Sequence, residues 1–178
     1  MIEEQRTTKE TRVRAKVAIG TGKSTVTTTV PFLDHMMGAL SRYAAIDLDL
    51  TAEGDLRHHI IEDVAITLGG AIRRLAPPTA VRYADRTVPM DDALVQAVLD
   101  LGGRPYYRGP LPSALYDHWM RSFCDHAGVT LHVRVLRGSD RHHIVEAAFK
   151  ALGFALRDAL ADGGGVASTK GVVRLEQR

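Results

Sequence analysis

One histidine-rich motif occurs twice in the chain. It reads His58-His59-Ile60-Ile61-Glu62 in the first half and returns as His142-His143-Ile144-Val145-Glu146 in the second. Each copy follows, at nearly the same distance, an Asp-His-x-Met segment, at residues 34–37 and at residues 117–120. A repeat of this length is too long for a solenoid unit and predicts two similar halves that carry one set of side chains twice.

The repeated side chains are types that bind transition metals. On a helix, a histidine four residues before a glutamate shares its face, whereas adjacent histidines point about 100° apart. We therefore expect each His-His pair to divide between two metal sites, each with three histidines and one glutamate. Two open octahedral positions would make such a site catalytic rather than structural. The candidate ligands are His35, His58, His59, Glu62, His118, His142, His143 and Glu146.

Other features of the composition limit the possible functions. Taken alone, any one of these histidines is as compatible with a solvated or core position as with a metal ligand. We interpret His126 and His132, which lie outside the repeated set, as structural. Cys124 is the only cysteine, which excludes a disulfide framework and favours the cytoplasm. A net charge of +2 argues against a nucleic-acid surface. The charged N-terminus and the lack of a long apolar run predict neither a signal peptide nor a membrane span.

The elements that must position these side chains follow from periodicity and turn residues. The first two expected strands, separated by a glycine turn, are predicted to form a hairpin. The expected strands are residues 10–19, 24–30, 46–50, 81–88, 93–101, 104–107 and 129–136, with a last short strand after a flexible tail that begins at residue 163. The expected helices are residues 32–44, 113–127 and 141–161, and one that runs from the turn at residues 54–55 through residue 72.

Interleaved strands and helices with hairpins predict an α+β fold rather than a fully parallel sheet. We expect an internal duplication of two βαβ-like halves, with mixed sheets and helices packed together on one face of each. With 178 residues, of which 45% are hydrophobic and 25% charged, the chain is typical of a globular protein. A single domain of residues 1–178 is expected, made of pseudo-repeats at about 1–90 and 91–178.

Six sequence blocks resemble imidazoleglycerol-phosphate dehydratase of histidine biosynthesis, in one order from Arg6 to Arg174. They are FLDHM at residues 32–36, HHIIED at 58–63, PMDDAL at 89–94, GRPY at 103–106, HHIVEAAFKA at 142–151 and STKG at 168–171. The resemblance implies a fold like domain 2 of ribosomal protein S5, with the helices of both halves between two sheets. It also implies a cytoplasmic lyase with two Mn²⁺ ions per active site. Those sites would lie between subunits of a closed homo-oligomer of 24 chains.

A phosphorylated substrate needs fixed positive charge and hydrogen-bond donors. Lys150 stands out from the residues alone, because it lies eight positions after His142 on an otherwise apolar stretch of helix. The resemblance implies that Asp91 faces the substrate hydroxyls and that Glu10 reaches the substrate. It implies phosphate contacts for Arg82, Arg104, Lys150, Ser168 and Lys170. The chain departs from the family pattern at Ala39, Tyr43, Leu56 and Asp140.

The resemblance implies dehydration of D-erythro-imidazoleglycerol phosphate to imidazole-acetol phosphate and water. Two metals on both ring nitrogens would stabilise an imidazolate and favour a diazafulvene-like intermediate as hydroxide leaves. Glu10 is the leading proton-transfer candidate because it is not a ligand, and Glu62 or Glu146 could serve if its ligation is transient. A metal-dependent phosphate hydrolase and a non-catalytic metal-storage protein remain alternatives. The ligand types accept Mn, Fe, Co, Ni or Zn, so manganese rests on the resemblance alone.

Overall fold

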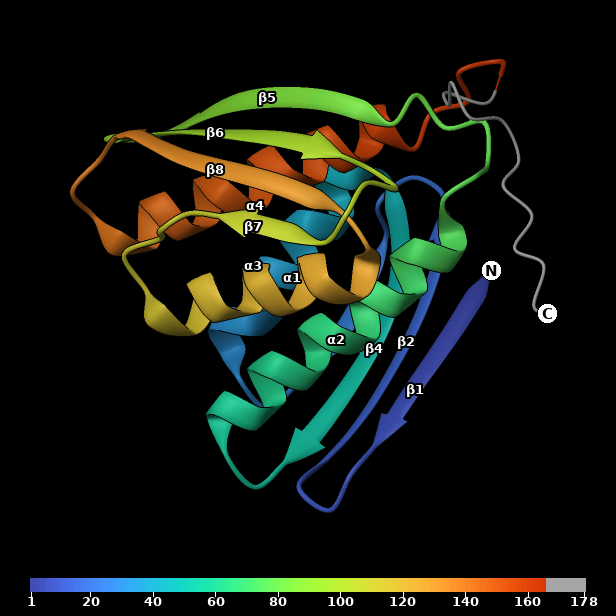
Figure 1. The fold of residues 1–178 in the computed structure, drawn as a ribbon. Coiled ribbons are helices and arrows are strands. Elements are labelled where there is room, and N and C mark those ends of the chain that lie inside the picture. Colours follow the sequence, from blue (N-terminus) through green and yellow to red (C-terminus); the bar gives the residue numbers. More distant parts are fainter. Residues whose placement is uncertain (166–178) are drawn as a thin grey trace, which may run out of the picture.

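A computed structural model of the chain describes residues 1–165. Strands and helices alternate along these residues in the same way in both halves (Figure 1). The strands are β1 (Ile2–Thr7), β2 (Thr11–Ile19), β3 (Ser24–Thr27), β4 (Ile46–Gly54), β5 (Tyr83–Met90), β6 (Ala93–Asp100), β7 (Tyr106–Arg108) and β8 (Thr130–Arg137). The helices are α1 (Pro31–Ala44), α2 (Arg57–Leu75), α3 (Ala114–Ala127) and α4 (Arg141–Ala159).

The strands form two sheets with the same topology. The first sheet has the order β1-β2-β4-β3 and the second sheet the order β5-β6-β8-β7. In each, three strands are antiparallel and the edge strand β3 or β7 runs parallel to its neighbour. The expected α+β fold with an internal duplication and two mixed sheets is therefore confirmed.

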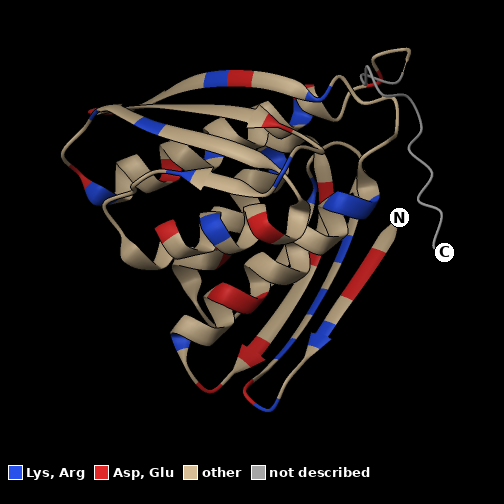
Figure 2. Ribbon diagram, viewed as in Figure 1, with Lys and Arg blue, Asp and Glu red and all other residues tan. Residues whose placement is uncertain are grey.

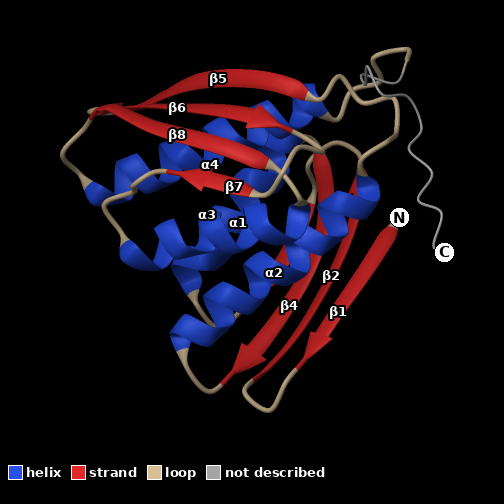
Figure 3. Ribbon diagram, in the orientation of Figure 1, coloured by secondary structure: helices blue, strands red, loops and turns tan. Residues whose placement is uncertain are grey.

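The four helices form a layer between the two sheets (Figure 3). Helix α2 packs on α3 and on the first sheet, whereas α1 packs on α4, which also covers β5 and β6. The buried apolar residues of both halves form one core cluster, in which Trp119 stacks on Phe123 at 5.1 Å and lies 4.7 Å from Phe149 between ring centroids. Among the described residues, no helix combines the length and apolarity that crossing a membrane requires.

Two equivalent glycines allow the helices of each pair to approach closely. A Cβ on Gly69 of α2 would lie 2.8 Å from the Phe123 carbonyl oxygen of α3. A Cβ on Gly153 of α4 would lie 2.9 Å from Tyr43 Cβ and 3.0 Å from the Leu40 carbonyl oxygen of α1. The duplicated glycine thus sets the spacing of both helix pairs.

The outer face of the first sheet is built from ion pairs across neighbouring strands. Residues of β2 alternate between buried and at least partly exposed, and Lys and Arg positions recur along this strand (blue in Figure 2). Arg14 lies 3.0 Å from Asp49 of β4, and Lys16 lies 3.6 Å from Glu3 of β1. The period-2 pattern that predicted a half-buried strand therefore reflects an inner face in the core and an outer face in water.

The predicted hairpin of residues 10–19 and 24–30 is wrong. Strand β3 pairs in parallel with β4, and β1, which was not predicted, lies beside β2 instead. The glycine turn crosses the start of β4, where the Asp47 carboxylate accepts the backbone N–H groups of Thr21 and Lys23 at 2.9 and 3.0 Å. The expected C-terminal strand lies outside the described residues.

Candidate metal centre and active site

The first cluster joins one histidine of the first half to the motif of the second. His35 Nε2 on α1 lies 3.2 Å from Glu146 Oε2 on α4, and His142 Nε2 lies 3.1 Å from the same oxygen. The other oxygen of Glu146 lies 2.9 Å from Lys150 Nζ. The ligand atoms of His35, His142 and Glu146 all lie within 4.8 Å of one another.

The second cluster joins one histidine of the second half to the motif of the first. His58 Nε2 and His118 Nε2 lie 3.5 and 3.3 Å from the two oxygens of Glu62, and the two imidazoles stack with centroids 5.3 Å apart. His58 and Glu62 belong to α2 and His118 to α3. Because α1 packs on α4 and α2 on α3, the histidine of each Asp-His-x-Met segment, His35 or His118, meets the His-His motif of the opposite half.

The remaining histidine of each pair points away from both clusters. The rings of His58 and His59 are 6.0 Å apart at 81°, and those of His142 and His143 are 5.9 Å apart at 88°. In one chain, each cluster thus brings together three of the four ligands expected, and His59 stands instead beside Asp55 and Glu10 in a third group of ligand atoms.

Carboxylates on three turns contact these outlying histidines. His59 Nδ1 lies 2.8 Å from Asp55 Oδ1 and 3.5 Å from Glu10 Oε2. His143 Nδ1 lies 2.8 Å from Asp92 Oδ1, and its Nε2 lies 3.3 Å from Asp91. Sequence reasoning missed Asp55 and Asp92. The four-residue spacing of Asp55 and His59 was a usable signal, whereas no local pattern links Asp92 to His143.

These contacts shift the proton affinities of the groups. The hydrogen bond that His59 donates to Asp55 raises the pKa of His59, and the one that His143 donates to Asp92 raises the pKa of His143. Donors from Ser139, His143 and Asp140 hold the pKa of Asp92 well below its usual range. Burial by itself would raise the pKa of Glu146, but hydrogen bonds with Lys150 and His35 outweigh it and lower that pKa.

The helix entries also help to orient the histidines. Asp140 is the N-cap of α4, and its side chain accepts the backbone N–H groups of His142 and His143. Leu56, at the equivalent position before α2, is 55% exposed and makes no side-chain cap. Asp140 and Leu56 both depart from the family pattern, but only Asp140 caps its helix with a side chain.

Both clusters fit a divalent transition metal. Imidazole nitrogens with a carboxylate are donors that such ions accept. His118 Nε2 is buried and has no hydrogen-bond partner among residues 1–165, although Glu62 Oε1 is 3.3 Å away. A buried polar atom without a partner is costly, and a cation would remove that cost.

Among the predicted phosphate contacts that fall within residues 1–165, Lys150 alone lies beside a cluster. Its Nζ contacts Glu146 and lies 3.0 Å from Met90 Sδ. Arg82 instead makes a two-point contact with Asp100, at 2.6 and 3.1 Å, just before β5. Its backbone N–H donates to the Ala159 carbonyl oxygen, at the C-terminal end of α4.

Arg82 and Arg104 lie at the far end of the second sheet from Asp91. The carbonyl oxygen of Arg104 accepts from Thr130, which is paired with Asp100, the partner of Arg82. Strand β5 has 8 residues and connects Arg82 to the turn at Asp91, a separation of about 25 Å at roughly 3.3 Å per residue. Ser168 and Lys170 lie outside the described residues.

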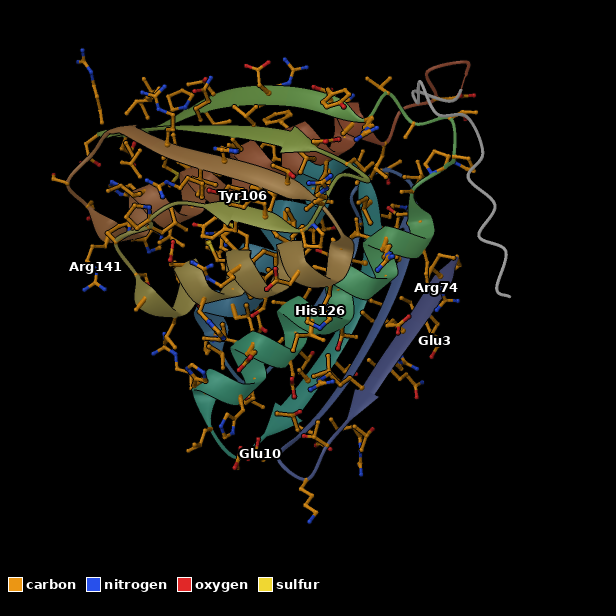
Figure 4. All side chains as sticks on the ribbon, in the orientation of Figure 1. Glu3, Glu10, Arg74, Tyr106, His126 and Arg141 are labelled. Atoms are coloured by element: carbon orange, nitrogen blue, oxygen red, sulfur yellow. The ribbon has the colours of Figure 1, made fainter. Side chains whose placement is uncertain are left out.

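Glu10 lies in the turn between β1 and β2, close to the start of α2 (Figure 4). Its carbonyl oxygen accepts the backbone N–H of Asp55 at 3.1 Å.

His126 and His132 lie apart from both clusters. His126 Nδ1 lies 2.9 Å from the Ser122 carbonyl oxygen, and the ring of His132 lies 5.5 Å from that of Tyr106.

Comparisons with known proteins agree along nearly the whole chain. The family profile described as Imidazoleglycerol-phosphate dehydratase matches residues 28–156. Proteins of that name from Kineococcus radiotolerans and Bordetella petrii are 42% and 46% identical, over 95% and 94% of this chain and 96% of each relative. The crystal structure of IGPD from Pyrococcus furiosus superposes with a TM-score of 0.86 at 39% identity, covering 95% of this chain and 99% of that one.

A second solved structure, imidazoleglycerol-phosphate dehydratase from Staphylococcus aureus, has a TM-score of 0.81 and 30% identity. It covers 90% of this chain and 98% of its own. Matches in sequence and in fold thus extend over both halves and over both clusters. The chain belongs to the imidazoleglycerol-phosphate dehydratase family and is a lyase.

Proposed function

We propose that the chain catalyses metal-dependent dehydration of imidazoleglycerol phosphate to imidazole-acetol phosphate and water, as a hydro-lyase of histidine biosynthesis. The observation that carries this proposal is the pair of His-His-Glu clusters, one of them beside Lys150, in a member of this family. A cytoplasmic location is part of the proposal and rests on the family and on the single cysteine.

The two clusters would hold two divalent cations per active site, and manganese is the metal we propose. His35, His142 and Glu146 would hold one, and His58, Glu62 and His118 the other. His59 and His143, which point away from their own clusters, would supply the fourth ligands to clusters of neighbouring copies. When bound, the cations would polarise both nitrogens of the substrate imidazole and favour loss of its ring proton.

Among the carboxylates, the geometry favours Glu10 for proton transfer to and from carbon. Hydrogen bonds with Lys150 and His35 lower the pKa of Glu146, so its carboxylate is a weak base. Glu62 faces two imidazoles, at 3.3 and 3.5 Å. Glu10 belongs to neither of the two clusters and lies at the edge of the His59 group, where it could reach a substrate bound nearby.

The distribution of positive charge supports a homo-oligomer with sites between subunits. Arg82 and Arg104 lie at the opposite end of the second sheet from Asp91 and His143. One small substrate cannot span the roughly 25 Å between these ends. In a closed symmetric assembly, the arginine end of one copy can meet the cluster end of another. The 24-chain size rests on the resemblance.

One experiment separates this function from its rivals. The purified chain is incubated with Mn²⁺ and imidazoleglycerol phosphate, and product absorbance and inorganic phosphate are followed together. We expect product without phosphate release, loss of turnover on chelation, and its return when Mn²⁺ is added back. Phosphate release at the rate of substrate loss would indicate a hydrolase. Metal binding without turnover would indicate a storage or assembly protein.

A further inference from the structure

The two histidines outside the clusters share one arrangement. His59 Nδ1 and His143 Nδ1 each lie 2.8 Å from a carboxylate oxygen, of Asp55 and of Asp92. An ionised carboxylate can only accept a hydrogen bond, so the proton of each neutral imidazole resides on Nδ1. The lone pair is then on Nε2, the atom that would bind a metal. In His143 this nitrogen lies 3.3 Å from Asp91 Oδ2, a contact that a metal would replace.

The two halves reach this arrangement by different routes. Asp55 precedes His59 by four residues, and one oxygen, Oδ1, accepts from both Leu56 N at 2.6 Å and His59. Asp92 contacts His143 across 51 positions, from the turn between β5 and β6. Its second oxygen, Oδ2, accepts from Ser139 N, Ser139 Oγ and Asp140 N at 2.7, 3.0 and 3.1 Å. Duplication of the sequence alone does not explain this agreement, because the two aspartates are not equivalent in the repeat.

We propose that Asp55 and Asp92 are positioning residues, which fix the tautomer and orientation of His59 and His143 so that each presents Nε2 to a metal held by another copy of the chain. This inference rests on the proposed function, since it requires both imidazoles to be ligands. Carboxylate partners of this kind set ring orientation and raise the basicity of the ligand, and their loss typically lowers metal affinity 10- to 100-fold.

The rival role for Asp55 is direct ligation. Glu10, Asp55 and His59 offer ligand atoms within 4.8 Å of one another, and all three side chains reach solvent. Asp92 does not share this ambiguity, because its two oxygens already accept four hydrogen bonds. A carboxylate offers about four acceptor positions, so a metal would have to displace a donor.

Substitution by asparagine separates the two roles, because the aspartates use their oxygens differently. In Asp55→Asn, one amide oxygen can still accept from both Leu56 and His59, so the Nδ1–H tautomer is retained. In Asp92→Asn, the oxygen is required by the three donors of Ser139 and Asp140. The NH₂ group then faces His143 Nδ1 and favours the opposite tautomer, with the proton on Nε2.

The test uses the full chain with Mn²⁺ alone as probe, and measures free Mn²⁺ by electron paramagnetic resonance. Nitrogen NMR of ¹⁵N-histidine-labelled, metal-free protein reports the tautomers. We expect Asp55→Ala and Asp92→Asn each to lower Mn²⁺ affinity 10- to 100-fold and to move the proton of His59 or His143 toward Nε2. Asp55→Asn should restore affinity to within a few-fold of the original chain.

Glu53→Ala is the matched control. It removes an equal charge two residues from Asp55, where the carboxylate pairs with exposed Arg12 at 3.3 Å, and should leave affinity and tautomers unchanged. Asp55→Asn as weak as Asp55→Ala, with the tautomer retained, would assign Asp55 as a ligand and overturn the positioning role. Unchanged affinity in Asp55→Ala and Asp92→Asn would overturn it as well. Failure of the unsubstituted chain to bind Mn²⁺ or to turn over would instead count against the proposed function.

Discussion

Replacement of Gly69 by alanine tests the close packing of α2 on α3. The added Cβ would lie 2.8 Å from Phe123 O and 3.0 Å from Ala127 N, both backbone atoms of α3. Backbone cannot rotate aside as a side chain can, so the helices must separate, and overpacking of this kind costs about 1–3 kcal/mol. Alanine regains about 1 kcal/mol in helix propensity. We expect a net destabilisation of about 1 kcal/mol.

Gly70→Ala is the control at the adjacent position of the same helix. The three atoms nearest to its Cβ would all belong to the Glu4 side chain, at 3.6 Å and beyond, which is ordinary van der Waals contact. The propensity gain then remains, and this variant should be more stable than the original chain by roughly 0.5–1 kcal/mol. The two variants, of identical composition, should therefore differ by about 2 kcal/mol.

Thermal unfolding at one protein concentration, with metal removed, measures this difference. For a chain of this length about 2 kcal/mol corresponds to roughly 4–8 °C between the two midpoints. Gly69→Ala should also weaken Mn²⁺ binding at the second cluster, since α2 carries His58 and Glu62 and α3 carries His118. Equal midpoints for the two variants would refute the close approach of α2 and α3 at Gly69.

Four further predictions concern charge, ligands, assembly and substrate. The backbone N–H groups of Lys23 and Thr21 lower the pKa of Asp47 in the folded chain. The ionised Asp47 carboxylate therefore stabilises the fold fully above the unfolded pKa of about 3.9, and this stabilisation is lost as pH falls through the folded pKa. Urea unfolding should therefore show Asp47→Ala less stable than the original chain at pH 7 and closer to it at pH 3. His35→Ala should lose one bound metal per chain, whereas His132→Ala should retain the full count by elemental analysis. Chelation at mildly acidic pH should dissociate a large particle into smaller units in sedimentation, because metal binding needs neutral histidine. Substrate methylated at either ring nitrogen should not be dehydrated, and turnover within tenfold of normal, about 1.4 kcal/mol of barrier, would contradict binding of both nitrogens by metal.

The spacing of neighbouring residues in the sequence was sufficient to predict several features of the structure. The four-residue spacing of His58 and Glu62 places both side chains on one face of α2. His58 and His59 are adjacent in the chain, so their side chains point in different directions. Both relations are set by the number of residues per helical turn. Period-2 alternation identified β2, and the repeat identified two similar halves. These features depend on residues a few positions apart, where backbone geometry alone relates the side chains.

Only the tertiary structure decided which elements meet. His35 lies beside Glu146 of the opposite half, and Asp92 beside His143 across 51 positions. Strand β3 pairs with β4 rather than with its neighbour in the chain, and Arg82 lies at the far end of the sheet from Asp91. Periodicity states which face of a helix or strand is apolar, but not which partner will cover it. That choice depends on burial and close packing summed over the whole core, to which both halves of the chain contribute.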